Sequence, residues 1–117
     1  MQIMKPIPIL CCYLLLALQP SAQSYNKDSV LAVVKSIRSR PVDTAQLRLL
    51  RELGYDIGSM DSSLAKEVIQ ESLSKSLALQ EPRAITSAYR MLGLWYSGVG
   101  NREEAMANYR NAQEVAQ

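Results

Sequence analysis

The sequence predicts an all-α protein built from antiparallel helical pairs, and three observations lead to this fold class. Apolar residues recur at offsets of three and four through most of residues 28–117, which is the spacing of one helix face. Turn signals at Pro41, Gly58 and Pro82 divide this region into segments of helix length. A helical pair marked by Leu-Gly in its first helix occurs twice. We therefore expect one leading helix followed by about two repeats of a helix-turn-helix solenoid.

The first 23 residues have the pattern of a secretory signal peptide. Lys5 precedes an apolar run over residues 7–18, and small residues follow it. The run is shorter than the roughly 20 residues that a membrane-spanning helix needs. We expect residues 1–23 to be removed on export to the periplasm or the extracellular space; an uncleaved membrane anchor is the alternative. Cys11 and Cys12 would leave with the peptide, so the mature chain would be stabilised by packing without disulfides.

Residues 27–40 are expected to form the leading amphipathic helix. Asp28 is a candidate N-cap, and Pro41 ends the helix. Its apolar face carries Val30, Val33, Val34 and Ile37. A membrane-surface helix or a linear motif is an alternative, but a helix that covers the end of a repeat stack explains the pattern more simply.

Residues 43–81 are expected to form the first repeat. Asp43 and Gln46 have the offset of a capping box at the start of its first helix. That helix carries the series Leu50, Leu53, Gly54 and Ile57. The stripe of the second helix, which follows Gly58 and Asp61, consists of Ala65, Ile69, Ser72, Leu73 and Leu77.

Residues 82–117 are expected to form the second repeat. Pro82 suits the first position of a helix, where its missing N–H costs nothing. Gly98 and Gly100 then end the first helix, and Asn101 with Glu104 has the offset of another capping box. The two facing stripes consist of Tyr89, Leu92, Gly93 and Tyr96 in the first helix and Ala105, Tyr109 and Ala112 in the second.

Close approach of the paired helices is expected at their smallest residues. Gly93 and Ala105 are the smallest residues on the facing stripes of the second repeat, and Gly54 and Ala65 hold the same places in the first. We therefore predict that each glycine packs against the alanine of the helix that follows it.

This pattern resembles the tetratricopeptide repeat. With Thr86 as the first position, eight residues match signature positions of that family: Tyr89, Leu92, Gly93, Tyr96, Gly100, Ala105, Tyr109 and Ala112. The usual Pro would fall on Gln117. The spacing from Gly54 to Gly93 is 39 residues, longer than the standard repeat of about 34. Repeats of this length are similar to those in exported sensory regions of bacterial membrane histidine kinases.

The resemblance also implies where a peptide would bind. In the family, the first helix of each pair lines a concave groove through its second, fifth, ninth and twelfth positions. These positions hold Arg48, Arg51, Tyr55 and Gly58 in the first repeat and Ser87, Arg90, Leu94 and Ser97 in the second. Arginines on one face suit an acidic peptide, whereas a solvated face with ordinary pairs such as Arg48 with Glu52 is the simpler alternative. Trp95 is expected to belong to the core.

The composition argues against catalysis. The chain contains no histidine, so it cannot hold a Ser-His-Asp or Cys-His arrangement, and no metal-ligand or phosphate-loop spacing occurs. We expect no enzyme activity, no cofactor and no bound metal. The formal net charge is +2 with acids and bases interspersed, so nucleic acid is not an expected partner.

The expected function is therefore to hold a protein or peptide partner. Stacks of this kind usually need about three repeats, and two are found here. The leading hypothesis is the periplasmic sensory front part of a two-component-type signalling protein, joined to the membrane through a missing downstream segment or an uncleaved signal. The alternative is a free-standing exported scaffold that forms a homo-oligomer through its last helix.

Overall fold

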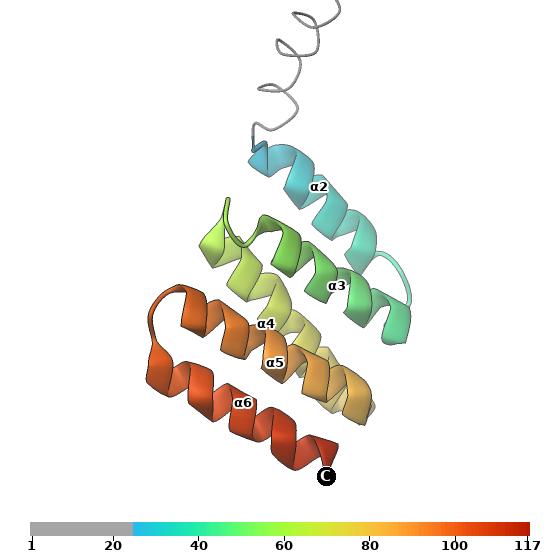
Figure 1. Ribbon diagram of the computed structural model, residues 1–117. Coiled ribbons are helices and arrows are strands. Elements are labelled where there is room, and N and C mark those ends of the chain that lie inside the picture. The colour runs from blue at the N-terminus through green and yellow to red at the C-terminus, as the bar shows by residue number, and fades with distance from the viewer. Residues whose placement is uncertain (1–24) are drawn as a thin grey trace, which may run out of the picture.

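The computed structural model describes residues 25–117, and this part of the chain consists of α-helices that pack one after another (Figure 1). The helices are α2 (Lys27–Arg38), α3 (Thr44–Ile57), α4 (Ser62–Leu79), α5 (Pro82–Gly98) and α6 (Arg102–Ala116). Each helix packs against the next in the chain, and α3 also contacts α5. The predicted all-α, repeat-like fold is thus confirmed, with α2 leading and with α3–α4 and α5–α6 as the two pairs. The predicted signal peptide lies outside the described residues.

Four of the five described helices begin at a side-chain cap, and two of these caps, Asp43 and Asn101, were predicted from the sequence. Asp43 accepts a hydrogen bond from the Gln46 backbone N–H at 2.9 Å, and Asp61 accepts one from Leu64 at 3.0 Å. Asn101 caps α6 in the same way. For α2 the prediction was wrong by two residues, because Asn26 is the N-cap and Asp28 lies in the first turn. A carboxylate there still interacts favourably with the helix dipole.

Each of the two connections on either side of α5 contains one residue with a positive φ. In the connection that follows α5, Gly100 has a φ of 80°, a left-handed conformation that glycine adopts without strain. It comes two residues after Gly98, the last residue of α5. In the connection that precedes α5, Gln80 caps the end of α4 and is also in the left-handed conformation, with a φ of 55°, although it is not a glycine. Glu81 precedes Pro82 at the start of α5 but makes no side-chain cap hydrogen bond.

Glycines mark the crossings within both helical pairs, but their partners differ from the prediction. A Cβ atom on Gly54 would lie 2.5 Å from Cγ1 of Ile69, and one on Gly93 would lie 2.5 Å from Cε1 of Tyr109. Each glycine therefore makes room for a bulky side chain of the following helix. Ala65 and Ala105, the predicted partners, are buried one helical turn earlier.

The core shows how α2 is attached to the first pair. Its buried members are Val34 and Ile37 from α2, Leu50 and Ile57 from α3, and Leu64, Ala65 and Val68 from α4. Val30 packs at the edge of this cluster. Val33 was predicted to lie on the buried face of α2, but it is 46% exposed. The apolar contact of α2 is therefore narrow.

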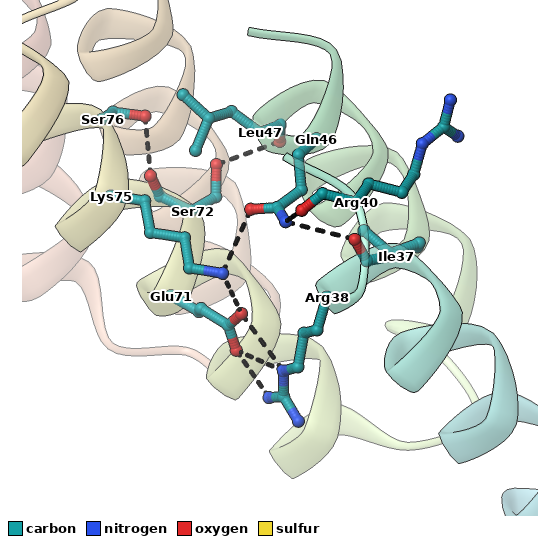
Figure 2. Close-up of polar contacts among 9 residues, drawn as sticks. All are labelled: Ile37, Arg38, Arg40, Gln46, Leu47, Glu71, Ser72, Lys75 and Ser76. Carbon is teal, nitrogen blue, oxygen red and sulfur yellow. Dashed lines mark hydrogen bonds and ion pairs between the residues drawn. The ribbon is translucent and has the colours of Figure 1, made fainter. Parts of the chain in front are cut away.

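A polar network supplements that narrow contact (Figure 2). Gln46 is completely buried, and its Nε2 donates to the carbonyl oxygens of Ile37 at 3.1 Å and Arg40 at 2.9 Å. Lys75 donates to Oε1 of the same side chain. The expected capping box at Asp43 is therefore only half formed, because the Gln46 side chain instead satisfies carbonyls at the end of α2.

Glu71 on α4 completes the network. Arg38 of α2 donates to both of its carboxylate oxygens, from Nε at 2.9 and 3.1 Å, and Lys75 donates to it at 2.9 Å (Figure 2). The hydrogen bond from Arg38 and then that from Lys75 hold the pKa of the Glu71 carboxyl below its ordinary value, against the opposing effect of burial. The end of α2 is thus tied to both helices of the first pair.

Candidate peptide-binding groove

Most of the predicted groove residues of α3 and α5 are exposed to solvent. Arg48, Arg51 and Tyr55 follow one another at offsets of three and four, so they form one stripe along α3. Ser87 and Leu94 are seven residues apart on α5 and likewise share a face. Tyr55 is 68% exposed and Leu94 is 53% exposed, and both line the same hollow. These two stripes line two separate hollows.

The first hollow, which we call the arginine hollow, lies between the beginnings of α3 and α5. It has a volume of about 540 Å³ and is lined by Thr44, Ala45, Arg48, Arg51, Glu81, Arg83, Ala84 and Ser87. Three arginines and one acidic residue, Glu81, therefore contribute to its lining. Arg83 was missed by the sequence analysis because it is not at a groove position of the repeat; its place in the first turn after Pro82 was the available signal.

Arg51 is the least solvated of these arginines. Its Nη1 is buried and has no hydrogen-bond partner within residues 25–117. Burial holds the pKa of the Arg51 guanidinium below its ordinary value; nearby Glu52 opposes this shift, and the like charge of Arg48 adds to it. An unsatisfied buried donor lowers the stability of the folded chain.

Arg48 forms the pair with Glu52 that is expected of an ordinary solvated helix face. Its Nε lies 3.8 Å from Glu52 Oε1, and both side chains are largely exposed. An exposed pair at this spacing contributes roughly 0.3–0.5 kcal/mol, so it does not commit the Arg48 guanidinium to Glu52. Arg48 therefore remains available to the arginine hollow.

The second hollow, which we call the apolar hollow, lies towards the ends of α3 and α5. Its volume is about 330 Å³, and its lining includes Tyr55, Met91, Leu94, Trp95 and Val99 together with Gly54, Gly58, Ser59, Ser62, Ile69 and Gly98. Most of this lining is apolar. Such a hollow suits an aliphatic or aromatic side chain.

Trp95 forms a fixed wall of the apolar hollow. Its indole Nε1 donates to the backbone carbonyl of Ser62 at 2.8 Å, and Lys66 Nζ lies 4.9 Å from the ring centroid. It also packs against the core, on the side of the preceding helix α4, as predicted. Trp95 is only half-buried, however, so one ring both supports the core and lines the hollow.

Arg90 does not join the other predicted groove residues. It lines a different hollow, between α5 and α6, together with Thr86, Met106, Tyr109, Arg110, Ala112, Gln113 and Ala116. Arg90 lies between Ser87 and Leu94 on the same stripe of α5, at the offsets that Arg51 has on α3, but it does not line the arginine hollow. Helix α6 packs along the side of α5 on which Arg90 stands, so its surroundings come from the second pair alone.

Neither a cluster of metal ligands nor a membrane-spanning helix is found in the described part of the chain. Residues 25–117 contain no group of three or more Cys, Asp or Glu side chains placed to hold a metal ion. None of the helices in this range is long and apolar enough to cross a membrane. Glu103 and Glu104 are exposed in the first turn of α6, where the positive end of the helix dipole favours a carboxylate.

Comparisons with known proteins give no further assignment. No family model matches the chain, and neither a curated protein nor a solved structure is significantly similar to it. The resemblance to tetratricopeptide repeats therefore rests on the residues quoted above.

Proposed function

We propose that this protein is a non-catalytic protein-binding module of the tetratricopeptide type. The observation that supports this proposal is that exposed Tyr55 and Leu94 line the same apolar hollow, next to the arginine hollow on the same two helices. Large exposed apolar groups that line a concave site are typical of interaction surfaces. Binding would be passive, because stacked helices present the groove and no bond is made or broken.

The proposed setting is the exported sensory part of a two-component-type signalling protein, in which occupation of the groove reports a periplasmic protein or peptide. A free-standing exported scaffold is the second candidate. It is favoured by Met106, which is 53% exposed on α6 and could contact a second copy of the chain. The two differ in oligomeric state: a monomer favours the sensory part, and a dimer that Met106→Glu dissociates favours the scaffold. Light scattering after size-exclusion chromatography measures this.

The binding function is tested by selection from a displayed library of random peptides on the immobilised chain. We expect enriched peptides whose binding falls at least tenfold in a Tyr55→Ser, Leu94→Ser double variant. Leu77→Ser is the matched control, because Leu77 is 47% exposed on α4 but lines neither hollow. Equal binding of the enriched peptides by the wild-type chain and the double variant would rule out the groove as the binding site.

A further inference from the structure

We propose that α2 is an acid-released strap on the first helical pair: the carboxylates of Asp61 and Glu71 hold its two ends, and their protonation frees α2 while α3–α6 stay folded. Neither the candidate groove nor its ligand takes part in this release, which is therefore independent of the proposed function. Three features of the molecule support it: the anchoring of α2 at both ends, its small buried apolar surface, and the dependence of its anchors on pH.

Each end of α2 is bound to a carboxylate of α4 or of its N-cap. At the beginning of α2, the Tyr25 hydroxyl donates to Asp61 Oδ2 at 2.8 Å, and Lys27 Nζ lies 3.6 Å from the same oxygen. At its end, Arg38 Nε donates to both carboxylate oxygens of Glu71 (Figure 2). The two carboxylates are separated by about 15 Å along α4, and α2 is about 18 Å long. Helix α2 therefore runs in the same direction as α4 and is fastened to it at both ends.

Apolar packing holds α2 less firmly than it holds the next three helices. Only Val34 and Ile37 of α2 are buried, whereas α3, α4 and α5 each bury five or six residues. Leu31 and Val33, on either side of this narrow face, are 41% and 46% exposed. Helix α2 lies at the end of the described stack, beside α3 (Figure 1). The polar anchors therefore contribute a large share of its attachment.

Protonation of Glu71 weakens the anchor at the end of α2. The pKa of the Glu71 carboxyl is held below its ordinary value of 4.5, first by the hydrogen bond from Arg38 and also by that from Lys75, against the effect of burial. Glu67 also acts on Arg38 through its charge, and from α3 the neutral Gln46 accepts a hydrogen bond from Lys75. Because the pKa is lower in the folded state, the contribution of Glu71 is present above about pH 4.5 and is lost as the pH falls through the folded value.

Asp61 has the same role at the beginning of α2 and also caps α4. The pKa of its carboxyl lies below the ordinary value of 3.8, mainly because of the hydrogen bond from the Leu64 backbone N–H; the hydrogen bond from Tyr25 and the charge of Lys27 add to this, and burial opposes it. Oδ1 accepts the bond from Leu64, whereas Oδ2 faces Tyr25 and Lys27. A proton on Oδ2 therefore removes the anchor and leaves Oδ1 able to cap α4.

The first pair keeps its own polar contacts when α2 leaves. The Ser72 hydroxyl donates to the Leu47 carbonyl at 3.1 Å, and Lys75 donates to Gln46 Oε1 at 3.1 Å (Figure 2). Neither bond involves a carboxylate. The Gln46 side chain also donates to carbonyls in the last turn of α2 and in the connection to α3, and these bonds do not titrate. Helix α2 therefore stays close to its site and can dock again when the pH rises.

Release of α2 uncovers an apolar surface of the first pair. Leu50, Ile57, Leu64 and Val68 form one core cluster with the two buried residues of α2. At neutral pH the occupant of this surface is α2 itself. Acidification would make the surface accessible without unfolding the helices that form it.

Hydrogen exchange of the full chain, followed by mass spectrometry, tests this release. Protection factors of α2 and α5, corrected for the effect of pH on exchange in unfolded peptides, are compared at about pH 6 and about pH 3. We expect α2 of the wild type to lose at least about tenfold more protection than α5 on acidification. The Asp61→Asn, Glu71→Gln double variant should have a weakly protected α2 already at pH 6, with no further relative loss at pH 3. Asparagine at position 61 keeps the cap of α4.

Two control variants separate the anchors from other effects. Glu52→Gln removes a carboxylate from an exposed pair within α3, so the protection of α2 should equal that of the wild type at both pH values. Gln46→Ala removes the hydrogen bonds that do not titrate. It should therefore lower the protection of α2 at both pH values and leave the additional loss at low pH in place.

Three results would each overturn the proposal. Loss of protection in α2 and α5 together would mean that acid unfolds the whole domain. A pH dependence of α2 that persists in the double variant would mean that other groups control its release. If Glu52→Gln lowered the protection of α2 as much as the double variant does, the effect would come from net charge and not from the two anchors.

Discussion

Substitution of Gly54 by alanine tests the packing on which the helical pairs depend. Within a helix this change normally stabilises by about 1 kcal/mol, because alanine has the higher helix propensity. Here the new Cβ would lie 2.5 Å from Ile69 Cγ1 and 3.1 Å from Val68 Cγ2. Ile69 is 2% exposed, and a β-branched residue in a helix strongly prefers a single χ1 rotamer, so moving Cγ1 away is costly. Overpacking of this kind costs about 1–3 kcal/mol, which leaves a net loss of up to about 2 kcal/mol.

Gly98 provides the matched control for this prediction. It is the last residue of α5, and a Cβ there would have nothing within 4 Å. Gly98→Ala should therefore stabilise the protein by about 0.5–1 kcal/mol. Urea unfolding followed by circular dichroism measures both changes. If both substitutions changed the free energy of unfolding in the same direction, the argument that close packing requires a glycine at position 54 would be refuted.

A double-mutant cycle identifies the side chain responsible. In an Ile69→Ala background the nearest obstacle to the new Cβ is gone, so Gly54→Ala should lose at least half of its cost. A cost that is unchanged in this background would assign the clash to Val68 instead.

Three further predictions concern the second pair and the attachment of α2. Gly93→Val should destabilise the protein by about 2–4 kcal/mol, because the branched side chain would meet the Tyr109 ring; an unchanged melting temperature would contradict the observed crossing. Gln46→Ala should cost about 1–3 kcal/mol by leaving buried carbonyls unsatisfied, and hydrogen exchange should accelerate in α2 more than in α5. The pKa of the Glu71 carboxyl lies below its ordinary value of 4.5 in the folded protein, so its stabilising contribution is present above that pH and is lost as the pH falls through the folded value. Glu71→Gln should therefore show a smaller loss of stability than the wild type when urea midpoints at about pH 6 and about pH 3 are compared.

Helix periodicity and capping residues were sufficient to predict the order of the helices. The offsets of Leu50, Gly54 and Ile57 identify the buried face of α3 without reference to any other element. The residue opposite each glycine could not be predicted in this way, because it depends on the angle and register at which two helices cross. Sliding α6 by one turn along α5 would place Ala105 instead of Tyr109 opposite Gly93, and both residues fit the spacing of the buried face of α6.

The candidate groove was predicted only in part, for a related reason. Repeat positions place Arg48, Arg51 and Ser87 near one another, and the arginine hollow contains all three. The repeat pattern cannot show that α6 packs beside Arg90, or that the first turn of α5 brings Arg83 to the hollow. Both depend on contacts between elements. Gln46 was also misjudged, since a local capping pattern does not reveal that the end of α2 needs hydrogen-bond donors.

The connection between α4 and α5 constrains the geometry of the candidate groove. Only Gln80 and Glu81 separate the two helices, and the ring of Pro82 fixes the backbone at the next residue. The two helical pairs therefore have little freedom to hinge apart. A rigid groove loses little entropy when it is occupied, but it cannot stretch to fit a longer or shorter partner. Recognition would then depend on the length of the bound segment as strictly as on its chemical groups.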